Sequence, residues 1–173
     1  VFLGEHDALN APTEIILFAA EQAISILGLQ ESYMKGCNLF LFGSVDSLLG
    51  AEQNLFESLN GLGCSTFINI GLESADQETL EHIGKPVEAA KVQEAFARML
   101  DINNRFDRIE VTANFIMDEN LPSGHIPAFL KLVREHLSGP QNKGTVYLSP
   151  LCSHSPSERT LFEFNQLKTL SRL

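Results

Sequence analysis

The stretch from Thr66 to Pro86, TFINIGLESADQETLEHIGKP, decides the fold. Its first five residues, Thr66–Ile70, are rich in β-branched and aromatic side chains, which predicts a buried strand. Ser74 and Gln77 have the S-x-x-Q spacing of a capping box, so a helix is expected to begin there. Glu73 is therefore expected at the carboxyl end of a strand and beside the positive end of a helix. Parallel α/β proteins bind ligands at that edge, whereas an acid that only complements the helix dipole would occupy the same position.

Strands and helices alternate along the whole chain. Five strands are predicted, at Val1–Leu3, Asn38–Phe42, Thr66–Ile70, Arg108–Phe115 and Gly144–Leu148. Apolar spacing predicts helices from Pro12 to Leu27, from Leu48 to Leu59, after Ser74, from Val87 to Asn103, from Ile126 to Leu137 and after a second capping box at Ser155 and Glu158. No hairpin turn joins two strands, so the sheet should be parallel. We expect an α/β fold, either an open doubly wound sheet or, as we favour, five βα units of a partial TIM-like barrel.

Composition restricts the classes of protein and partner. A chain of 173 residues with 44% hydrophobic residues suits one domain, spanning 1–173. The net charge of -10 and the absence of a dense Lys/Arg cluster argue against nucleic acid as a partner. No run of about 18 apolar residues and no basic, then apolar, leader is present, so we expect a cytoplasmic chain without a membrane partner.

The cysteines and histidines do not form a metal-binding pattern. Cys37, Cys64 and Cys152 are odd in number and far apart, which favours a reduced protein in which they are small buried apolar residues. The five histidines are scattered without H-E-x-x-H spacing and are expected on surfaces or loops. No G-x-S-x-G, P-loop or G-x-G-x-x-G pattern is present, so hydrolase and nucleotide-phosphate sites of those kinds are not expected.

The motifs that end the strands resemble those of radical S-adenosylmethionine (SAM) enzymes. The run INIGLES, followed by Asp76, Leu80 and the IGK that ends at Lys85, resembles the fourth strand and following helix of that family. VFLGE at the start is similar to its second-strand motif, VTANFI with the later LP to its fifth strand and loop, and TVYLSP to its sixth strand. The resemblance covers most of the chain, and each motif is only moderately specific.

The resemblance implies a set of SAM-binding residues. It implies that Glu5 contacts the SAM amino group, that Glu73 and Ser74 make polar contacts with the ribose or methionyl part, and that Ile116 and Leu148 pack on adenine. Ser44 and Asn114 are expected to end strands at the same rim, where they could face SAM or a substrate; capping or loop hydrogen bonds are equally reasonable roles. Catalytic residues and the substrate, a small molecule or a macromolecule, are not identified by the sequence.

Two departures from the family pattern qualify this interpretation. The C-x-x-x-C-x-x-C triplet that binds a [4Fe-4S] cluster is absent, and Asp118 stands where many relatives have glycine. One explanation for the first departure is that the first βα unit and its cluster loop lie upstream of Val1, so that the chain holds the second to sixth of six units. The parent would then cleave SAM to a 5'-deoxyadenosyl radical, whereas this chain alone would be inactive and would expose its first strand as an apolar edge.

An alternative of a different class remains open. The chain could be a cluster-free α/β module that binds a small ligand or a protein partner. In that case ligand affinity would survive Glu5→Ala and Glu73→Ala, and the parent would contain no iron.

Overall fold

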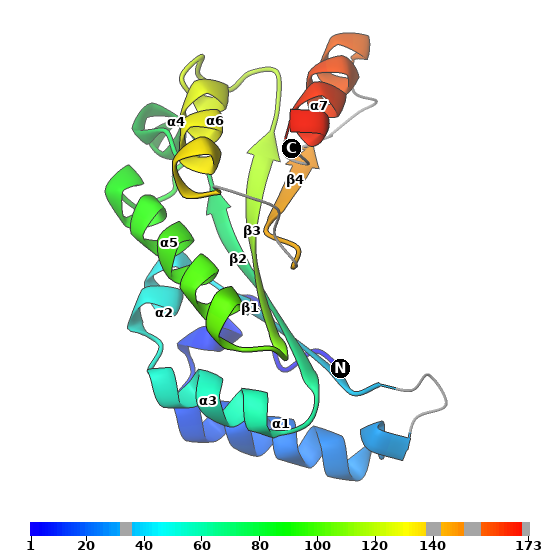
Figure 1. Ribbon diagram of the computed structural model, residues 1–173. Coiled ribbons are helices and arrows are strands. Elements are labelled where there is room, and N and C mark those ends of the chain that lie inside the picture. The colour runs from blue at the N-terminus through cyan, green and yellow to red at the C-terminus, as the bar shows by residue number, and fades with distance from the viewer. Residues whose placement is uncertain (32–35, 138–142, 151–156, 171–173) are drawn as a thin grey trace.

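Four parallel strands form one sheet in the computed structural model, which describes residues 1–31, 36–137, 143–150 and 157–170. The strands are β1 (Asn38–Gly43), β2 (Ser65–Glu73), β3 (Ile109–Met117) and β4 (Val146–Pro150), and they lie side by side in chain order (Figure 1). Each neighbouring pair is parallel. The predicted parallel α/β class is therefore confirmed.

Helices make the crossovers between the strands. The α-helices are α1 (Thr13–Ile26), α2 (Val45–Gly50), α3 (Gln53–Gly61), α4 (Gln77–His82), α5 (Ala89–Arg105), α6 (His125–His136) and α7 (Glu158–Leu170), with short 3-10 helices at η1 (Ala8–Asn10) and η2 (Leu29–Glu31). One helix was expected from Leu48 to Leu59, but the chain is extended at Ala51 and Glu52, which separates α2 from α3. The Arg98 guanidinium of α5 donates to the carbonyls of Leu49 and Ala51 and so stabilises this corner.

The first expected strand is reduced to an isolated bridge. Phe2 pairs with Phe40 of β1 in parallel, through bonds of 2.9 Å from Leu3 N–H to Phe40 O and 2.8 Å from Phe40 N–H to Val1 O. Phe2 is 64% exposed, so an apolar side chain lies at the free edge of the sheet, as expected. The sheet itself has four strands rather than five.

The capping box expected at Ser74 is wrong. The residue that caps α4 is Asp76, whose carboxylate accepts the Thr79 N–H at 3.0 Å and the Thr79 hydroxyl at 2.7 Å. The Ser74 hydroxyl instead accepts the Asp76 N–H at 3.1 Å. The helix therefore begins at Gln77, because a carboxylate nearer to the first turn takes the cap. The second expected box begins at Ser155, outside the described residues, and α7 starts at Glu158.

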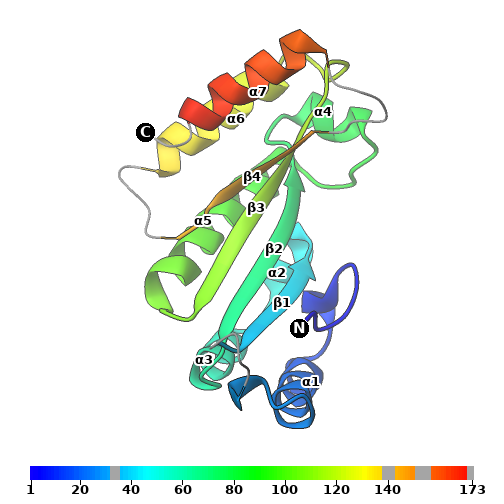
Figure 2. The same cartoon turned by 90° about the vertical axis from the view of Figure 1, so that its right-hand side faces the viewer.

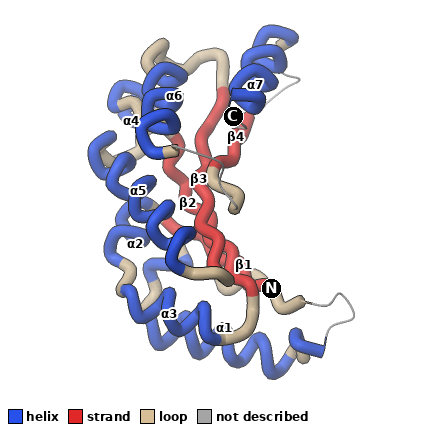
Figure 3. Tube along the Cα trace, viewed as in Figure 1, coloured by secondary structure: helices blue, strands red, loops and turns tan. Residues whose placement is uncertain are grey.

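One face of the sheet packs on helices and the other is largely uncovered. In β2, Thr66, Ile68, Ile70 and Leu72 are buried, and the residues between them are only half-buried. The buried face packs on apolar side chains of α5 such as Phe96 and Met99. Figure 2 shows the strands in front with α2 and α5 behind them. Figure 3 shows α2, α5 and α6 on one side of the strands and α7 beside β4 on the other. We call the uncovered side the open face.

Among the described residues, no helix is both long enough and apolar enough to span a bilayer.

Candidate functional site

The end of β2 carries an ion pair held in an unusual backbone conformation. Glu73 has a φ of 64°, in the left-handed region that few residues other than glycine adopt. The Lys85 ammonium donates to the Gly71 carbonyl at 2.9 Å and lies 3.4 Å from the Glu73 carboxylate. Both side chains keep part of their surface exposed, at 28% for Lys85 and 22% for Glu73. A carboxylate and an ammonium are thus presented together at the carboxyl rim, as predicted for Glu73.

Gly71 makes room for this pair. A Cβ on Gly71 would lie 2.6 Å from Glu73 Oε1 and 3.4 Å from Lys85 Nζ. The shorter distance is below any real contact of a Cβ atom, so a side chain here would displace the carboxylate. The absence of a side chain at Gly71 therefore leaves the space that the Glu73 carboxylate occupies.

Ser44 takes the structural role that was considered for it. It caps α2 in a reciprocal box with Ser47, and its hydroxyl donates to Asp7 at 2.8 Å while its N–H donates to the other Asp7 oxygen at 2.9 Å. Burial raises the pKa of Asp7, but the hydrogen bonds from Ser47 and Ser44 and the charge of Lys85 outweigh it and lower the pKa. Ser44 and Lys85 therefore both stabilise the Asp7 carboxylate, and Lys85 also pairs with Glu73.

Ser74 is buried and its hydroxyl is already bonded. Its oxygen lies 2.8 Å from Nδ1 of His125, and Nε2 of the same ring lies 2.8 Å from the Ile116 carbonyl. Because a carbonyl can only accept, Nε2 carries the proton and Nδ1 accepts from Ser74. Burial lowers the pKa of His125. His125, expected on a surface or loop, is thus an interior residue that joins the ends of β2 and β3 to α6. The Ser74 hydroxyl is engaged with this ring and with the Asp76 N–H.

The three predicted residues of β3 and β4 do not form one cluster. Asn114 was expected to end its strand, but β3 continues to Met117, and Asn114 instead lies on the open face, where it accepts from the Ser149 hydroxyl at 2.5 Å. Ile116 pairs with Ser149 and Leu148 with Phe115, so Ile116 and Leu148 project to opposite faces of the sheet. Both could contact one adenine only through main-chain atoms.

Glu5 lies in the exposed loop that follows the first bridge. Its neighbours Gly4 and His6 have φ values of 108° and 54°, which turn the chain sharply on both sides of it. The carboxylate is therefore presented to solvent at the same end of the sheet as Asp7.

The open face holds a groove of about 430 Å³. One side of the groove is aromatic, with Phe2, Phe40, Phe42 and Phe67 on the first bridge, β1 and β2. The other side is mainly polar, with Asn69, Thr112, Asn114 and Ser149, although Tyr147 of β4 also lines it. Of the predicted site residues only Asn114 and Leu148 line it. The candidate site therefore has two parts, a charged rim around Glu73 and Lys85 and a groove on the open face.

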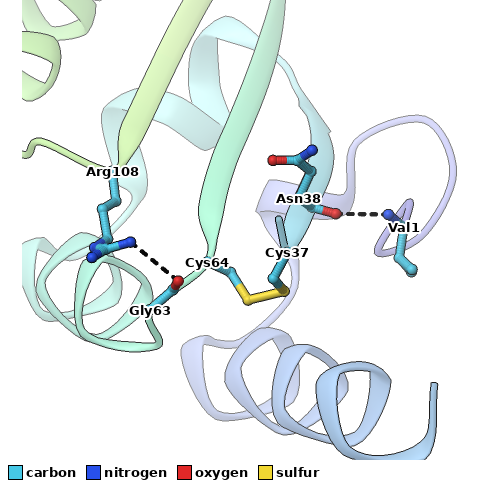
Figure 4. The surroundings of a disulfide bond; sticks show 6 residues. All are labelled: Val1, Cys37, Asn38, Gly63, Cys64 and Arg108. Atoms are coloured by element: carbon cyan, nitrogen blue, oxygen red, sulfur yellow. Dashed lines mark hydrogen bonds between the residues drawn. A yellow bond between two sulfur atoms is a disulfide. The ribbon is translucent and has the colours of Figure 1, made fainter. Parts of the chain in front are cut away.

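The prediction of unpaired, reduced cysteines is wrong for two of the three. Cys37 and Cys64 form a disulfide with a Cα separation of 4.6 Å (Figure 4). They precede Asn38 and Ser65, which are register partners at the amino ends of β1 and β2. The two cysteines are 27 residues apart in the sequence, and the parallel register of β1 and β2 brings them together. Cys152 lies outside the described residues.

No described cluster could hold a metal. Among residues 1–31, 36–137, 143–150 and 157–170, no group of three or more His, Cys, Asp or Glu side chains has the required proximity. The disulfide also lies at the amino end of the sheet, away from the rim. The residues present therefore do not fit a [4Fe-4S] cluster.

Sequence reasoning missed three residues of the rim and its support. The sequence singles out Lys85 only as the end of the IGK run, does not single out Asp7, and shows His125 only as one of five scattered histidines. A signal existed for Lys85, because a lone lysine that follows a short helix in a βα unit can reach back over the strand. The contacts of Asp7 and His125 span 37 and 51 residues, so no local pattern shows them.

Comparisons with known proteins show the fold alone. No protein family model and no curated protein matches this chain. Among solved structures it is similar to the archaeal Methanocaldococcus infernus Elp3 with an N-terminal deletion, at a TM-score of 0.55 and 13% sequence identity. The similarity covers 96% of this chain and 39% of that chain, so this chain corresponds to less than half of the Elp3 structure.

Proposed function

We propose that this chain is the SAM-binding part of a radical SAM type of core, with the cofactor at the carboxyl rim of the sheet. Elp3 is a radical SAM family member, and its similarity over nearly the whole chain supports a related module. The observation that carries the proposal is the Glu73–Lys85 pair above Gly71. Three further motifs, VFLGE, VTANFI with the later LP, and TVYLSP, resemble those of the same family. A partial barrel is the architecture that the proposal implies.

The charges at the rim suit the polar groups of SAM. The methionyl part carries a carboxylate and an amino group, and the ribose carries two hydroxyls. Lys85 is the complement for the carboxylate, whereas Glu73 and the exposed Glu5 are complements for the amino group or the hydroxyls. Asn114 is the register partner of Gly71 and would contribute an amide. The main chain at Ile116 and Leu148 would contact adenine.

Cluster chemistry belongs outside the described residues. When bound, a [4Fe-4S] cluster supplies the electron for SAM cleavage in this family, and its thiolate ligands would come from elsewhere in the parent. The residues of this chain would bind and orient SAM. A parent that stays colourless after anaerobic reconstitution with iron and sulfide would contradict this assignment.

Calorimetric titration of the chain with SAM tests the binding step. We expect Glu73→Gln and Lys85→Met each to weaken binding by on the order of tenfold, because a hydrogen bond to a charged group contributes about 1.5 to 3 kcal/mol. Glu21→Gln and Lys131→Met are matched controls, since both side chains are exposed on helices away from the rim. Equal losses in the controls, or no SAM binding by the unmodified chain, would reject the proposal.

The second candidate is a cluster-free module that binds a small ligand. The observation that favours it is the groove on the open face, which has the volume of a small-molecule site and does not depend on the rim. It predicts ligand binding that is insensitive to Glu5→Ala and Glu73→Ala.

A further inference from the structure

Aromatic side chains form a row on the open face, from the bridge residue Phe2 across β1 to β2. The ring centroids of Phe2 and Phe40 are 5.1 Å apart, and those of Phe40 and Phe67 are also 5.1 Å apart, with interplanar angles of 30° and 17°. Phe42 stacks on Phe2 at 5.9 Å and 8°. These separations are in the range of favourable ring stacking. Rings of this kind accept a further flat ring at the end of the row.

The row ends on β3 at a carboxylate instead of a fourth ring. Glu110 is the register partner of Phe67 and lines the groove beside it. The Glu110 side chain has no hydrogen bond or ion pair to any other residue in the described part of the chain. Glu110 thus takes the position on β3 that an aromatic residue takes on β1 and β2, and it gives this part of the groove one negative charge.

No cation lines the groove among the described residues. The charge of the Lys143 ammonium acts on Glu110, but this ammonium donates to the main-chain carbonyls of Asn103, Phe106 and Ile109. Lys143 is therefore committed to the end of α5 and the start of β3. An anionic ligand would meet Glu110 without a compensating charge, whereas a cationic ligand would meet a carboxylate that has no direct partner.

The polar half of the groove is neutral and internally bonded. The Asn69 amide donates to the Thr112 hydroxyl at 2.9 Å, and Ser149 donates to Asn114. These groups offer hydrogen bonds to a ligand but add no charge. The lining is thus aromatic at one end, neutral at the other and negative at one point.

We propose that the groove binds a small molecule made of a flat unsaturated ring and a cationic nitrogen group, with the ring against Phe67 and the cation at Glu110. The volume of about 430 Å³ suits a small molecule, and the single carboxylate next to the aromatic row selects the charge. This inference deepens the proposed function, because the groove adjoins the rim and would hold the substrate. It also stands on its own contacts, since it uses neither Glu73 nor Lys85.

Tryptamine is the probe that tests the proposal. The chain contains no tryptophan, so indole fluorescence comes from the probe alone, and its anisotropy reports binding. We expect tryptamine to bind more tightly than indole, and indole more tightly than indole-3-propionate, which has the same ring and the opposite charge. The preference for tryptamine should fall with added salt, because the ion pair at Glu110 is partly exposed to solvent.

Variants separate the two parts of the groove. Glu110→Gln should weaken tryptamine by on the order of tenfold and leave indole unchanged. Phe67→Leu, which keeps an apolar side chain and avoids a large cavity, should weaken both tryptamine and indole. Glu94→Gln makes the same change of charge on the helix side of the molecule and should alter neither.

Two further outcomes would overturn the groove proposal, and a third comparison separates it from the proposed function. Equal binding of tryptamine and indole-3-propionate would show that charge does not select the ligand. Saturable self-association in sedimentation, undiminished by tryptamine, would show that a second copy covers the aromatic row instead. Loss of SAM binding with tryptamine binding intact would reject the proposed function and retain the groove, and the reverse result would do the opposite.

Discussion

The Ser74 hydroxyl lies 2.8 Å from Nδ1 of the buried His125 ring, which links the end of β2 to the first residue of α6. The other ring nitrogen bonds the Ile116 carbonyl, so one imidazole joins three segments directly beneath the rim. Only the neutral ring can accept from Ser74 and donate to Ile116 at the same time. The support of the rim therefore depends on the protonation of one histidine.

Stability should decrease as His125 becomes protonated. Burial holds the pKa of His125 below 6.5 in the folded chain, so the unfolded chain binds the proton more readily. The stabilisation is fully present above pH 6.5 and is lost as the pH falls below that value. Urea unfolding at about pH 8 and about pH 5 should show a larger loss for the unmodified chain than for His125→Asn. The exposed His82 provides the control His82→Asn, and an equal loss in both variants would contradict the assignment.

Glu73→Gly should be more stable than Glu73→Ala, and it should bind SAM less tightly than the unmodified chain. The φ of 64° at Glu73 costs an L-residue about 1 kcal/mol, which glycine avoids. Glu73→Gly should therefore unfold at a higher free energy than Glu73→Ala, by about 1 kcal/mol, although both lack the carboxylate. Urea unfolding of the two variants measures the difference. Equal stabilities would mean that the backbone relaxes when the Lys85 contact is lost.

Reduction of the Cys37–Cys64 disulfide should destabilise the chain. The bond closes a sequence separation of 27 residues, for which restriction of the unfolded chain gives about 3 to 4 kcal/mol. We expect a lower melting temperature with reductant, and the same lower value for a Cys37→Ala, Cys64→Ala double variant with or without it. Thiol titration of the denatured, unreduced chain should find one of the three cysteines reactive. Three reactive thiols would contradict the bond.

Removal of the Asp7 carboxylate should loosen the loop after the first bridge. Asp7→Asn loses the charge that accepts two bonds from Ser44 and should cost about 1 kcal/mol near neutral pH. Because the pKa of Asp7 is lowered in the fold, this stabilisation is present above about pH 4 and is lost as the pH falls below it. Urea unfolding across that range should show the two chains converging in acid. A constant difference would place the effect in packing instead of charge.

The strands were predictable because alternation of apolar residues is a local property. Each of β1 to β4 contains most of its predicted range, and Glu73 ends β2 as expected. The start of α4 was not predictable from the S-x-x-Q spacing, because Asp76 competes for the same amides and Ser74 has a better partner in His125. Helix caps depend on which polar side chain reaches the first turn, and that is settled by contacts far along the chain.

The candidate site was predictable only at the ends of the strands. Glu73 and Glu5 follow from the rule that parallel strands direct their carboxyl ends to one edge. The disulfide and the aromatic row could not be predicted, because both depend on register between strands that are 27 residues apart in the sequence. Two cysteines that each precede a strand are, in retrospect, a signal for such a pair.

The side chains that β2 places on the open face become more polar toward the carboxyl end of the strand. Successive residues on that face are Phe67, Asn69, Gly71 and Glu73, which change from aromatic to amide to bare backbone to carboxylate within one strand. At about 3.3 Å per residue the change extends over roughly 20 Å. The groove and the rim are thus two ends of one polarity gradient built from a single strand, so a ligand that spans both must itself be apolar at one end and charged at the other.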